Sequence, residues 1–380
     1  MTGLTDILQP FVDDGTLPGA VALVDRGDGT GPEVAAVGGA DAGGEAPMVR
    51  DSIFRIASLT KPVTAAAVMM LVEDGRFALT DAVAPWLPEI AAPVVVRTPA
   101  SPVDEVVPAK RPVTVADLMT FRAGWGFPCD FALPAVAPLF GELRQGPPRP
   151  QEVAAPDEWM AALGRIPMLY QPGEAWLYNT CSDVLGVLIA RVAGCSLPEF
   201  LAERIFEPLD MPDTGFAVPA GQSGRFTHLY RAGADGGLDL VDAPDGQWSA
   251  VPVFPSGAGG LVSTVDDYHR FARMLLDGGG PLLSADSVRR MTTDWLTPDQ
   301  RTGGALFLEG QGWGFGGSVD VMPTDPWNVP GRYGWLGGTG TAAHIVPSTG
   351  AVTILLTQRE MSDASAPEPM RAVWAYAASS

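Results

Sequence analysis

Ser58 and Lys61 stand three residues apart in the segment Ser58-Leu59-Thr60-Lys61. On a helix this spacing places both side chains on one face, with their Cβ atoms about 5–6 Å apart. Residues 63–72 are apolar almost throughout, so an amine on this helix loses hydration and needs a partner. The chain has only one other lysine, Lys110, which makes a chance pairing improbable. We therefore predict that Ser58 is a nucleophile and that Lys61 acts on its proton.

A serine nucleophile needs a base, and the sequence leaves two candidates open. Burial can lower the pKa of Lys61 until it accepts a proton, or the lysine ammonium can hold a tyrosine as phenolate. Tyr178 is the candidate tyrosine because it precedes a predicted helix at residues 185–192, although ordinary core packing is the alternative. No histidine is well placed, and no Gly-x-Ser-x-Gly motif occurs in the chain.

A pair of glycines supplies the third chemical element. Gly337 and Gly338 follow a predicted strand at residues 333–336, and glycines let a backbone N–H approach a substrate carbonyl closely. They therefore predict part of an oxyanion hole. Residues 338–343 also match the Gly-x-Gly-x-x-Ala pattern of dinucleotide sites, but Pro347 leaves no room for the helix that must follow. We predict no cofactor.

The predicted secondary structure that must position these residues differs between the ends and the middle of the chain. Strand patterns lie near both ends, and two long Pro-rich loops, residues 91–112 and 134–156, interrupt a helical middle. Loops of this length are usually lids or binding loops. The order predicts an α+β protein with a sheet domain (residues 1–64 and 220–380) and a helical lobe (residues 65–219). The expected strands cover residues 19–24, 34–38, 52–56, 312–319, 333–336, 342–346 and 351–357, and the expected helices cover residues 4–12, 58–72, 185–192, 197–206, 266–276 and 369–378.

The net charge of −20 excludes several classes of function. An acidic surface repels phosphate backbones and anionic lipids, so we predict no nucleic-acid or membrane partner. The N-terminal residues contain no basic and apolar signal pattern, and the three cysteines form no Cys-x-x-Cys pair. Three widely spaced histidines indicate no metal site. We expect a cytoplasmic protein, and its oligomeric state is left open.

The segments around Ser58, Tyr178 and Gly338 together resemble the serine β-lactamase and DD-peptidase superfamily, most closely the class C-like branch that includes family VIII carboxylesterases. Residues 54–61 are similar to the nucleophile segment of that branch, residues 117–124 to its "DLLTHTSG" segment and residues 259–267 to its "GGLxSTAxD" segment. The resemblance covers roughly residues 5–360. It implies a β-lactamase/transpeptidase-like fold, in which helices flank an antiparallel sheet and the active site lies in the cleft beside an inserted helical lobe.

The resemblance also implies a role for each residue. Ser58 would be the nucleophile, Lys61 its base or proton shuttle, and Tyr178 the second base and acid. The backbone N–H groups of Ser58 and Gly338 would form the oxyanion hole. Acylation by the substrate and hydrolysis of the acyl-enzyme would follow.

Two departures from the family pattern bear on the substrate. Trp335 stands where β-lactamases have the lysine of Lys-Thr-Gly, a cation near the substrate carboxylate. A charge-assisted contact of this kind is worth about 1.5–3 kcal/mol. Thr180 stands where Tyr-x-Asn has its asparagine, which removes an amide. Both changes favour small uncharged esters over penicillins or D-Ala-D-Ala peptides.

The predicted function is therefore that of a serine carboxylesterase acting on a small-molecule ester. We expect Trp125, Phe127, Trp335, Thr180 and Gly337 to line the substrate pocket, although core packing is the alternative for each aromatic residue. An acyltransferase, an amidase and a β-lactamase of the same fold remain open. So does a catalytically silent protein that only binds its ligand.

Overall fold

A seven-stranded antiparallel sheet forms the centre of the computed structural model, which describes residues 3–146 and 149–379. The strand order is β2-β1-β13-β12-β11-β10-β9, so the N-terminal hairpin pairs with the last strand of the chain. The strands are β1 (Gly19–Asp25), β2 (Glu33–Gly38), β9 (Gly312–Trp313), β10 (Ser318–Val319), β11 (Tyr333–Gly337), β12 (Thr341–Val346) and β13 (Ala351–Thr357).

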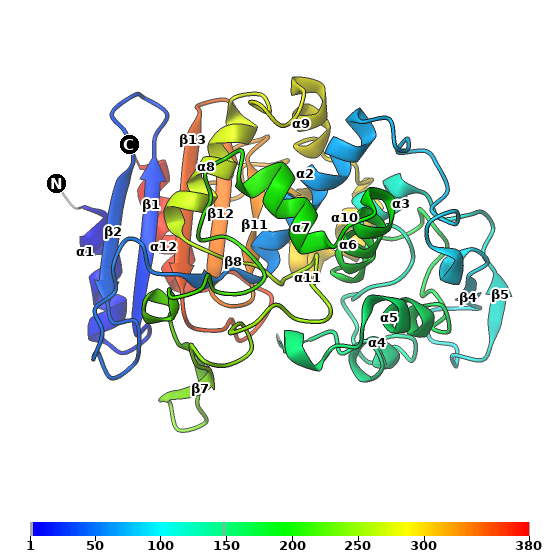
Figure 1. Ribbon diagram of the computed structural model, residues 1–380, viewed down its shortest axis with the longest axis horizontal. Coiled ribbons are helices and arrows are strands. Elements are labelled where there is room, and N and C mark those ends of the chain that lie inside the picture. Colours follow the sequence, from blue (N-terminus) through cyan, green and yellow to red (C-terminus); the bar gives the residue numbers. More distant parts are fainter. Residues whose placement is uncertain (1–2, 147–148, 380) are drawn as a thin grey trace.

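Both faces of this sheet are covered, which explains why β1 is buried along its whole length. Successive side chains of a strand point to opposite faces. Val21 and Leu23 pack in the main hydrophobic core, and the alternate residues Ala20, Ala22 and Val24 pack in a second core. The second core lies under α1 (Leu4–Asp13) and α12 (Glu368–Ala378), which pack together near the two chain ends (Figure 1). On the other face, α8 (Val265–Leu276) packs against β1, β12 and β13.

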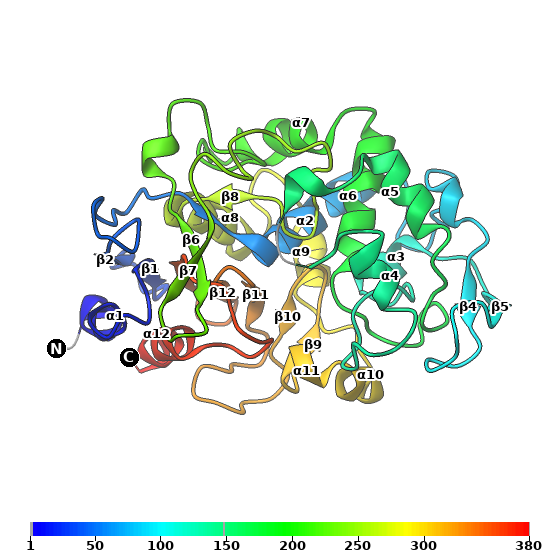
Figure 2. The same ribbon diagram turned by 90° about the horizontal axis from the view of Figure 1, so that it is seen from below.

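A helical lobe lies to one side of the sheet (Figure 1, Figure 2). Its central helix, α2 (Thr60–Glu73), is buried over almost its full length and packs against α6 (Thr180–Ala193). The further helices are α3 (Val115–Met119), α4 (Ala137–Gly141), α5 (Pro156–Leu163), α7 (Leu197–Leu201), α9 (Ala285–Met291), α10 (Pro298–Gly303) and α11 (Ala305–Leu308). Short 3-10 turns are η1 (Ala57–Leu59), η2 (Pro88–Ile90), η3 (Pro150–Glu152) and η5 (Ser223–Arg225), and η4 (Ala202–Phe206) is a π-helical turn.

Three two-stranded sheets complete the described fold. The pair β3–β8 is the one that bears on the site, because it holds the residues just before Ser58 next to the segment that follows Gly260. The pairs are β3 (Phe54–Arg55) with β8 (Val262–Ser263), β4 (Val94–Val96) with β5 (Val106–Pro108), and β6 (Leu229–Ala232) with β7 (Leu238–Asp242).

The predicted α+β architecture is confirmed, and two local predictions are wrong. The expected strand at residues 312–319 is a hairpin, because the turn between β9 and β10 folds against α2: a Cβ on Gly316 would lie 2.5 Å from the Lys61 carbonyl oxygen. The loop at residues 91–112 contains the β4–β5 hairpin. The two-domain division stays a prediction, and its boundary at residue 64 falls inside α2, in a core shared by sheet and lobe.

The longest described helices, α2 and α6, have 14 residues each, fewer than the roughly 20 that span a bilayer. None of the described helices alone has both the length and the apolar composition to cross a membrane. The helix α6 and the segment Leu197–Phe206 meet those criteria only as a pair, and they are bent by 82° relative to each other.

Candidate active site

Ser58 lies in the 3-10 turn that leads into α2, so its side chain sits at the N-terminal end of that helix. The preceding residue, Ala57, has a φ angle of 43°. A left-handed conformation in a residue other than glycine costs on the order of 1–3 kcal/mol and persists only where surrounding contacts enforce it. The strain therefore indicates that the fold fixes the backbone just before Ser58.

Two threonines of the sheet supply these contacts. The Thr339 hydroxyl donates a hydrogen bond to the carbonyl of Arg55 (2.6 Å), and the Thr341 hydroxyl donates to that of Ile56 (3.0 Å). The turn between β11 and β12 is thus bound to the residues that precede Ser58.

Gly337 and Gly338 occupy this turn in different ways. A Cβ on Gly337 would lie 2.6 Å from the Ile56 carbonyl oxygen, so glycine is needed there for close approach of the backbone. Gly338 has open space on that side and lines a cavity together with Ser58. Within the described residues, neither the Ser58 N–H nor the Gly338 N–H donates a hydrogen bond. Two free N–H groups at one cavity are what an oxyanion hole requires.

Lys61 is fully buried, and three oxygen atoms surround its amine. The Nζ atom lies 2.8 Å from Ser58 Oγ, 2.9 Å from Asn179 Oδ1 and 2.7 Å from the Ala258 carbonyl oxygen. Burial lowers the pKa of Lys61 to about 7, although the negative charge of Asp183 acts in the opposite direction. A neutral amine is therefore accessible near pH 7, hydrogen-bonded to the Ser58 hydroxyl.

Tyr178 is held against Ser58 by both its backbone and its hydroxyl. Its N–H and carbonyl pair with the backbone of Phe127, and its hydroxyl donates to Ser58 Oγ (2.8 Å). The indole N–H of Trp335 in turn donates to the Tyr178 hydroxyl oxygen (2.7 Å). Burial raises the pKa of Tyr178 to about 12, against the lowering effect of these two hydrogen bonds. The neutral phenol is the resting form, so of the two candidate bases Lys61 is the one that the electrostatics favours.

Asn179, between Tyr178 and α6, has φ 80° and ψ −66°, which is the geometry of a rare γ-turn. The Thr180 N–H donates to the Tyr178 carbonyl (3.2 Å) and closes this turn. The turn directs the Asn179 amide to Lys61 and the Thr180 side chain inward. The prediction that Thr180 lines the pocket is therefore wrong: its hydroxyl is buried and donates to Gln145 Oε1 (2.7 Å). An amide is also present at the site after all, supplied from the middle position of the Tyr-Asn-Thr segment.

Asp183 is a site residue that the sequence reasoning missed. Its buried carboxylate accepts hydrogen bonds from the Ser256 hydroxyl (2.6 Å), the Ala258 N–H (3.2 Å) and the Gln145 amide (3.1 Å). Burial raises the pKa of Asp183, and the positive charge of Lys61 partly opposes this shift. The available signal was a single acid in the first turn of a helix whose next seven residues carry no polar side chain.

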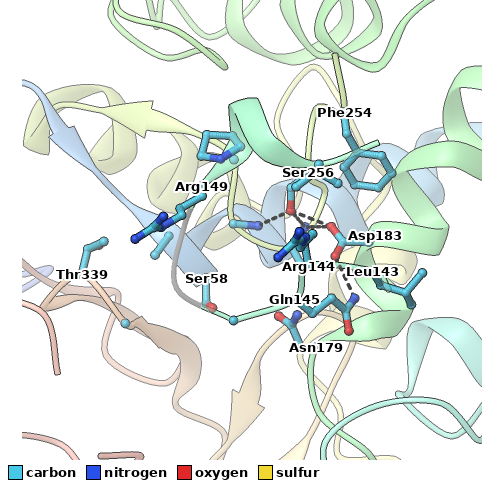
Figure 3. A pocket seen from close by; sticks show the side chains of 18 of the residues that line it. Ser58, Leu143, Arg144, Gln145, Arg149, Asn179, Asp183, Phe254, Ser256 and Thr339 are labelled. Atoms are coloured by element: carbon cyan, nitrogen blue, oxygen red, sulfur yellow. Dashed lines mark hydrogen bonds between the residues drawn. The ribbon is translucent and has the colours of Figure 1, made fainter. Parts of the chain in front are cut away.

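The cavity at Ser58 has a volume of about 310 Å³ (Figure 3). Asn179, Asp183 and Gly338 contribute to its polar wall. Much of the apolar wall comes from the loop at residues 134–156, which was predicted to border a binding site, and from the loop before β8. The loops contribute Leu143, Val153, Trp248 and Phe254, and the remaining apolar residues are Trp159 of α5 and Met361, which follows β13.

The predicted aromatic pocket residues lie behind this cavity and not along its described walls. Trp125 is 2% exposed, and its indole N–H donates to the Ile166 carbonyl (2.9 Å), so it belongs to the core. Phe127 stacks on Phe140. Trp335 is buried against Tyr178, which makes it a partner of the tyrosine. Gly337 likewise contacts protein and not the cavity.

The described residues contain no cluster of three or more histidine, cysteine, aspartate or glutamate side chains that could hold a metal ion. The Ser58 hydroxyl is in contact with an amine and a phenol, and two backbone N–H groups lie at the same cavity. Such a set can activate a serine and stabilise an oxyanion.

Sequence and structure comparisons relate the chain to known proteins. The Beta-lactamase family matches residues 4–378. Protein Rv1367c of Mycobacterium tuberculosis is 38% identical over 365 residues, which cover 92% of this chain and 88% of that protein. Esterase EstB of Burkholderia gladioli is 30% identical over 374 residues, with 92% and 88% covered.

Two solved structures have the same fold. EstCE1, a hydrolase with promiscuous acyltransferase activity, has a TM-score of 0.82 at 23% identity, and the match covers 98% of this chain and 96% of that one. Unliganded simvastatin synthase (LovD) from Aspergillus terreus has a TM-score of 0.79 at 20% identity, with 98% and 95% covered.

Proposed function

We propose that this protein, which belongs to the beta-lactamase family and has its fold, hydrolyses carboxylic esters through an acyl-enzyme on Ser58. The observation that carries the proposal is that Lys61 Nζ and the Tyr178 hydroxyl both lie 2.8 Å from Ser58 Oγ. Relatives named esterases and acyltransferases support a serine hydrolase that forms an acyl-enzyme. Esterase EstB and the lovastatin esterase of Penicillium rubens, 27% identical, also support esters as the substrate class.

Acylation begins with a proton transfer. Neutral Lys61 accepts the proton of the Ser58 hydroxyl, and Ser58 Oγ attacks the ester carbonyl carbon. The carbonyl oxygen becomes an oxyanion, which the N–H groups of Ser58 and Gly338 stabilise. Donors fixed in advance for this charge are commonly worth about 2.7–4 kcal/mol each.

Breakdown of the tetrahedral intermediate returns the proton. The Tyr178 hydroxyl donates to the leaving alcohol oxygen as the bond from carbon to that oxygen breaks, and Lys61 restores the proton of the tyrosine. The alcohol departs and leaves an ester on Ser58. Water then repeats the sequence, giving its proton to the same pair of residues and releasing the acid.

β-Lactamases have a lysine at position 335, and the absence of a cation at this place beside Tyr178 supports esters over β-lactams. Arg332, three residues earlier in the chain, does not supply the missing charge, because it is buried and lies 3.4 Å from the carboxylate of Asp320. An ester needs only the nucleophile, the base and the two N–H groups.

A fluorophosphonate probe tests the assignment directly. We expect one adduct on the peptide that contains Ser58, found by mass spectrometry of a digest, and no adduct in Ser58→Ala. Ser182, which is buried in α6, offers a control as Ser182→Ala and should label like the unmodified protein. Labelling of another residue, or equal labelling of Ser58→Ala, would refute the proposal.

Acyl transfer to an alcohol is the second candidate. It is favoured by the similarity to EstCE1, a hydrolase with promiscuous acyltransferase activity, and to relatives named acyltransferases. Hydrolysis of p-nitrophenyl butyrate in the presence of a competing alcohol separates the two activities, because chromatography resolves butyrate from the new ester. We expect butyrate as the main product.

A further inference from the structure

Two arginines line the cavity that contains Ser58, although the chain is strongly acidic (Figure 3). Arg149 forms an ion pair with Glu152, with Nη1 and Oε1 3.2 Å apart. Arg144 forms no side-chain hydrogen bond or ion pair with any residue that the structure describes. Most of the described arginines pair with carboxylates, so the unpaired guanidinium of Arg144 on the cavity wall is free to bind an anion that enters the cavity.

The backbone of Arg144 is held in place at a cost in free energy. Its φ angle is 54°, in the left-handed region that residues other than glycine rarely adopt. Both neighbours are buried and fix it: the Leu143 N–H bonds to the Pro138 carbonyl, and the Gln145 N–H bonds to the Leu139 carbonyl. The side chain of Gln145 is held by hydrogen bonds to Thr180 and Asp183. The exposed Arg144 thus projects from a fixed point.

Two carboxyl groups among the described residues line the cavity, and neither pairs with Arg144. Asp183 accepts three hydrogen bonds and faces the charge of Lys61. Glu360 lines the cavity as well, and burial raises its pKa and so favours the neutral acid. Neither acid lies within ion-pair distance of Arg144 in the structure.

We propose that the substrate carries a carboxylate, in its acyl or its alcohol part, and that Arg144 binds this carboxylate at the cavity wall. The inference rests on the proposed ester hydrolysis and names its substrate class. A guanidinium matches a carboxylate with two parallel hydrogen bonds. The uncharged substrate expected from the sequence depended on the residues at positions 335 and 180. Arg144 reaches the cavity from a different segment, the loop at residues 134–156.

Matched pairs of substrates test the proposal. The first set is the mono-p-nitrophenyl esters of adipic, pimelic and suberic acids, each compared with its neutral methyl p-nitrophenyl diester. The second is 3-carboxy-4-nitrophenyl butyrate compared with p-nitrophenyl butyrate, which places the charge on the leaving group. The quantity measured is the ratio of kcat/KM for the charged ester to kcat/KM for the neutral ester, corrected for spontaneous hydrolysis.

Arg144→Asn is the informative variant because asparagine tolerates a positive φ, so the loop keeps its conformation. We expect the ratio to fall about tenfold in at least one set of substrates. Arg144→Lys keeps the positive charge but cannot form two parallel hydrogen bonds to a carboxylate, so it should give an intermediate ratio. Arg97→Asn removes an exposed arginine that also lacks a side-chain partner among the described residues but does not line the cavity, so it should leave the ratio unchanged.

The outcomes distinguish a failure of the role of Arg144 from a failure of the proposed ester hydrolysis. If the unmodified protein hydrolyses both kinds of ester and Arg144→Asn leaves every ratio unchanged, the role of Arg144 is refuted and ester hydrolysis stands. If it hydrolyses neither kind, the proposed function fails and the substrate class fails with it. The proposal is supported if the ratio falls in Arg144→Asn and if 0.5 M NaCl also lowers the ratio of the unmodified protein. Salt screens the attraction between an exposed guanidinium and a carboxylate.

Discussion

Trp335→Phe should slow ester hydrolysis through Tyr178. The variant removes the indole N–H that donates to the Tyr178 hydroxyl oxygen at 2.7 Å, and it keeps an aromatic ring next to the tyrosine. This hydrogen bond lowers the pKa of Tyr178, so its loss raises that pKa further. The tyrosine then gives up its proton less readily to the leaving alcohol.

The magnitude follows from the charge that develops on the tyrosine oxygen. A hydrogen bond to a charged group is worth about 1.5–3 kcal/mol. Each 1.4 kcal/mol corresponds to about a tenfold change in rate, so kcat for p-nitrophenyl butyrate should fall roughly 10–150-fold. Replacing a buried indole by a phenyl ring also costs stability, on the order of 1–3 kcal/mol from lost packing.

Trp313→Phe is the matched control. Trp313 is fully buried with its ring centroid 4.7 Å from that of Trp335, but its indole N–H has no hydrogen-bond partner among the described residues. Both variants lose similar packing, so thermal denaturation should show similar decreases in Tm. We expect kcat of Trp313→Phe to stay within about threefold of the unmodified protein. Equal kcat values for the two variants would refute a role for the Trp335 N–H.

Three further changes test the proton path. Tyr178→Phe should lower kcat by about 10²–10⁴-fold in steady-state assays with the fold intact by circular dichroism; a loss under threefold would remove Tyr178 from the mechanism. Asp183→Asn removes a charge that raises the pKa of Lys61, so the acidic limb of kcat/KM against pH should move to lower pH, and a move to higher pH would contradict the assignment. Burial lowers the pKa of Lys61 from 10.5 to about 7, so the unfolded chain binds more protons than the folded chain between these values, and stability gains a contribution that rises with pH. Lys61→Met should flatten this rise between pH 7 and 9 in urea unfolding, and an unchanged slope would argue against the shifted pKa.

The sequence predicted the residues whose relative positions depend on local geometry. The offset between Ser58 and Lys61 is set by one turn of chain, and the paired glycines mark a strand end at which the backbone approaches closely. The strands at both ends of the chain were predictable from alternation and apolar runs, because the sheet is buried on both faces. These features need little tertiary information.

The substrate pocket was predicted poorly because its walls depend on tertiary packing. Trp125 and Phe127 are close to Tyr178 in the fold, yet both point into the core. The γ-turn at Asn179 reverses which of two adjacent side chains faces the site, and residue types alone do not encode that turn. The importance of Arg144 likewise comes from a loop conformation.

The packing of α1 against α12 has a consequence for protein engineering. Residues 4 and 378 belong to helices that share one core, on the face of the sheet opposite to α2 and Ser58. Affinity tags or surface attachment at either end should therefore leave the cavity accessible. The same proximity makes the chain suitable for circular permutation: a short linker can join the two ends, and new ends can be opened at an exposed turn such as the one between β6 and β7.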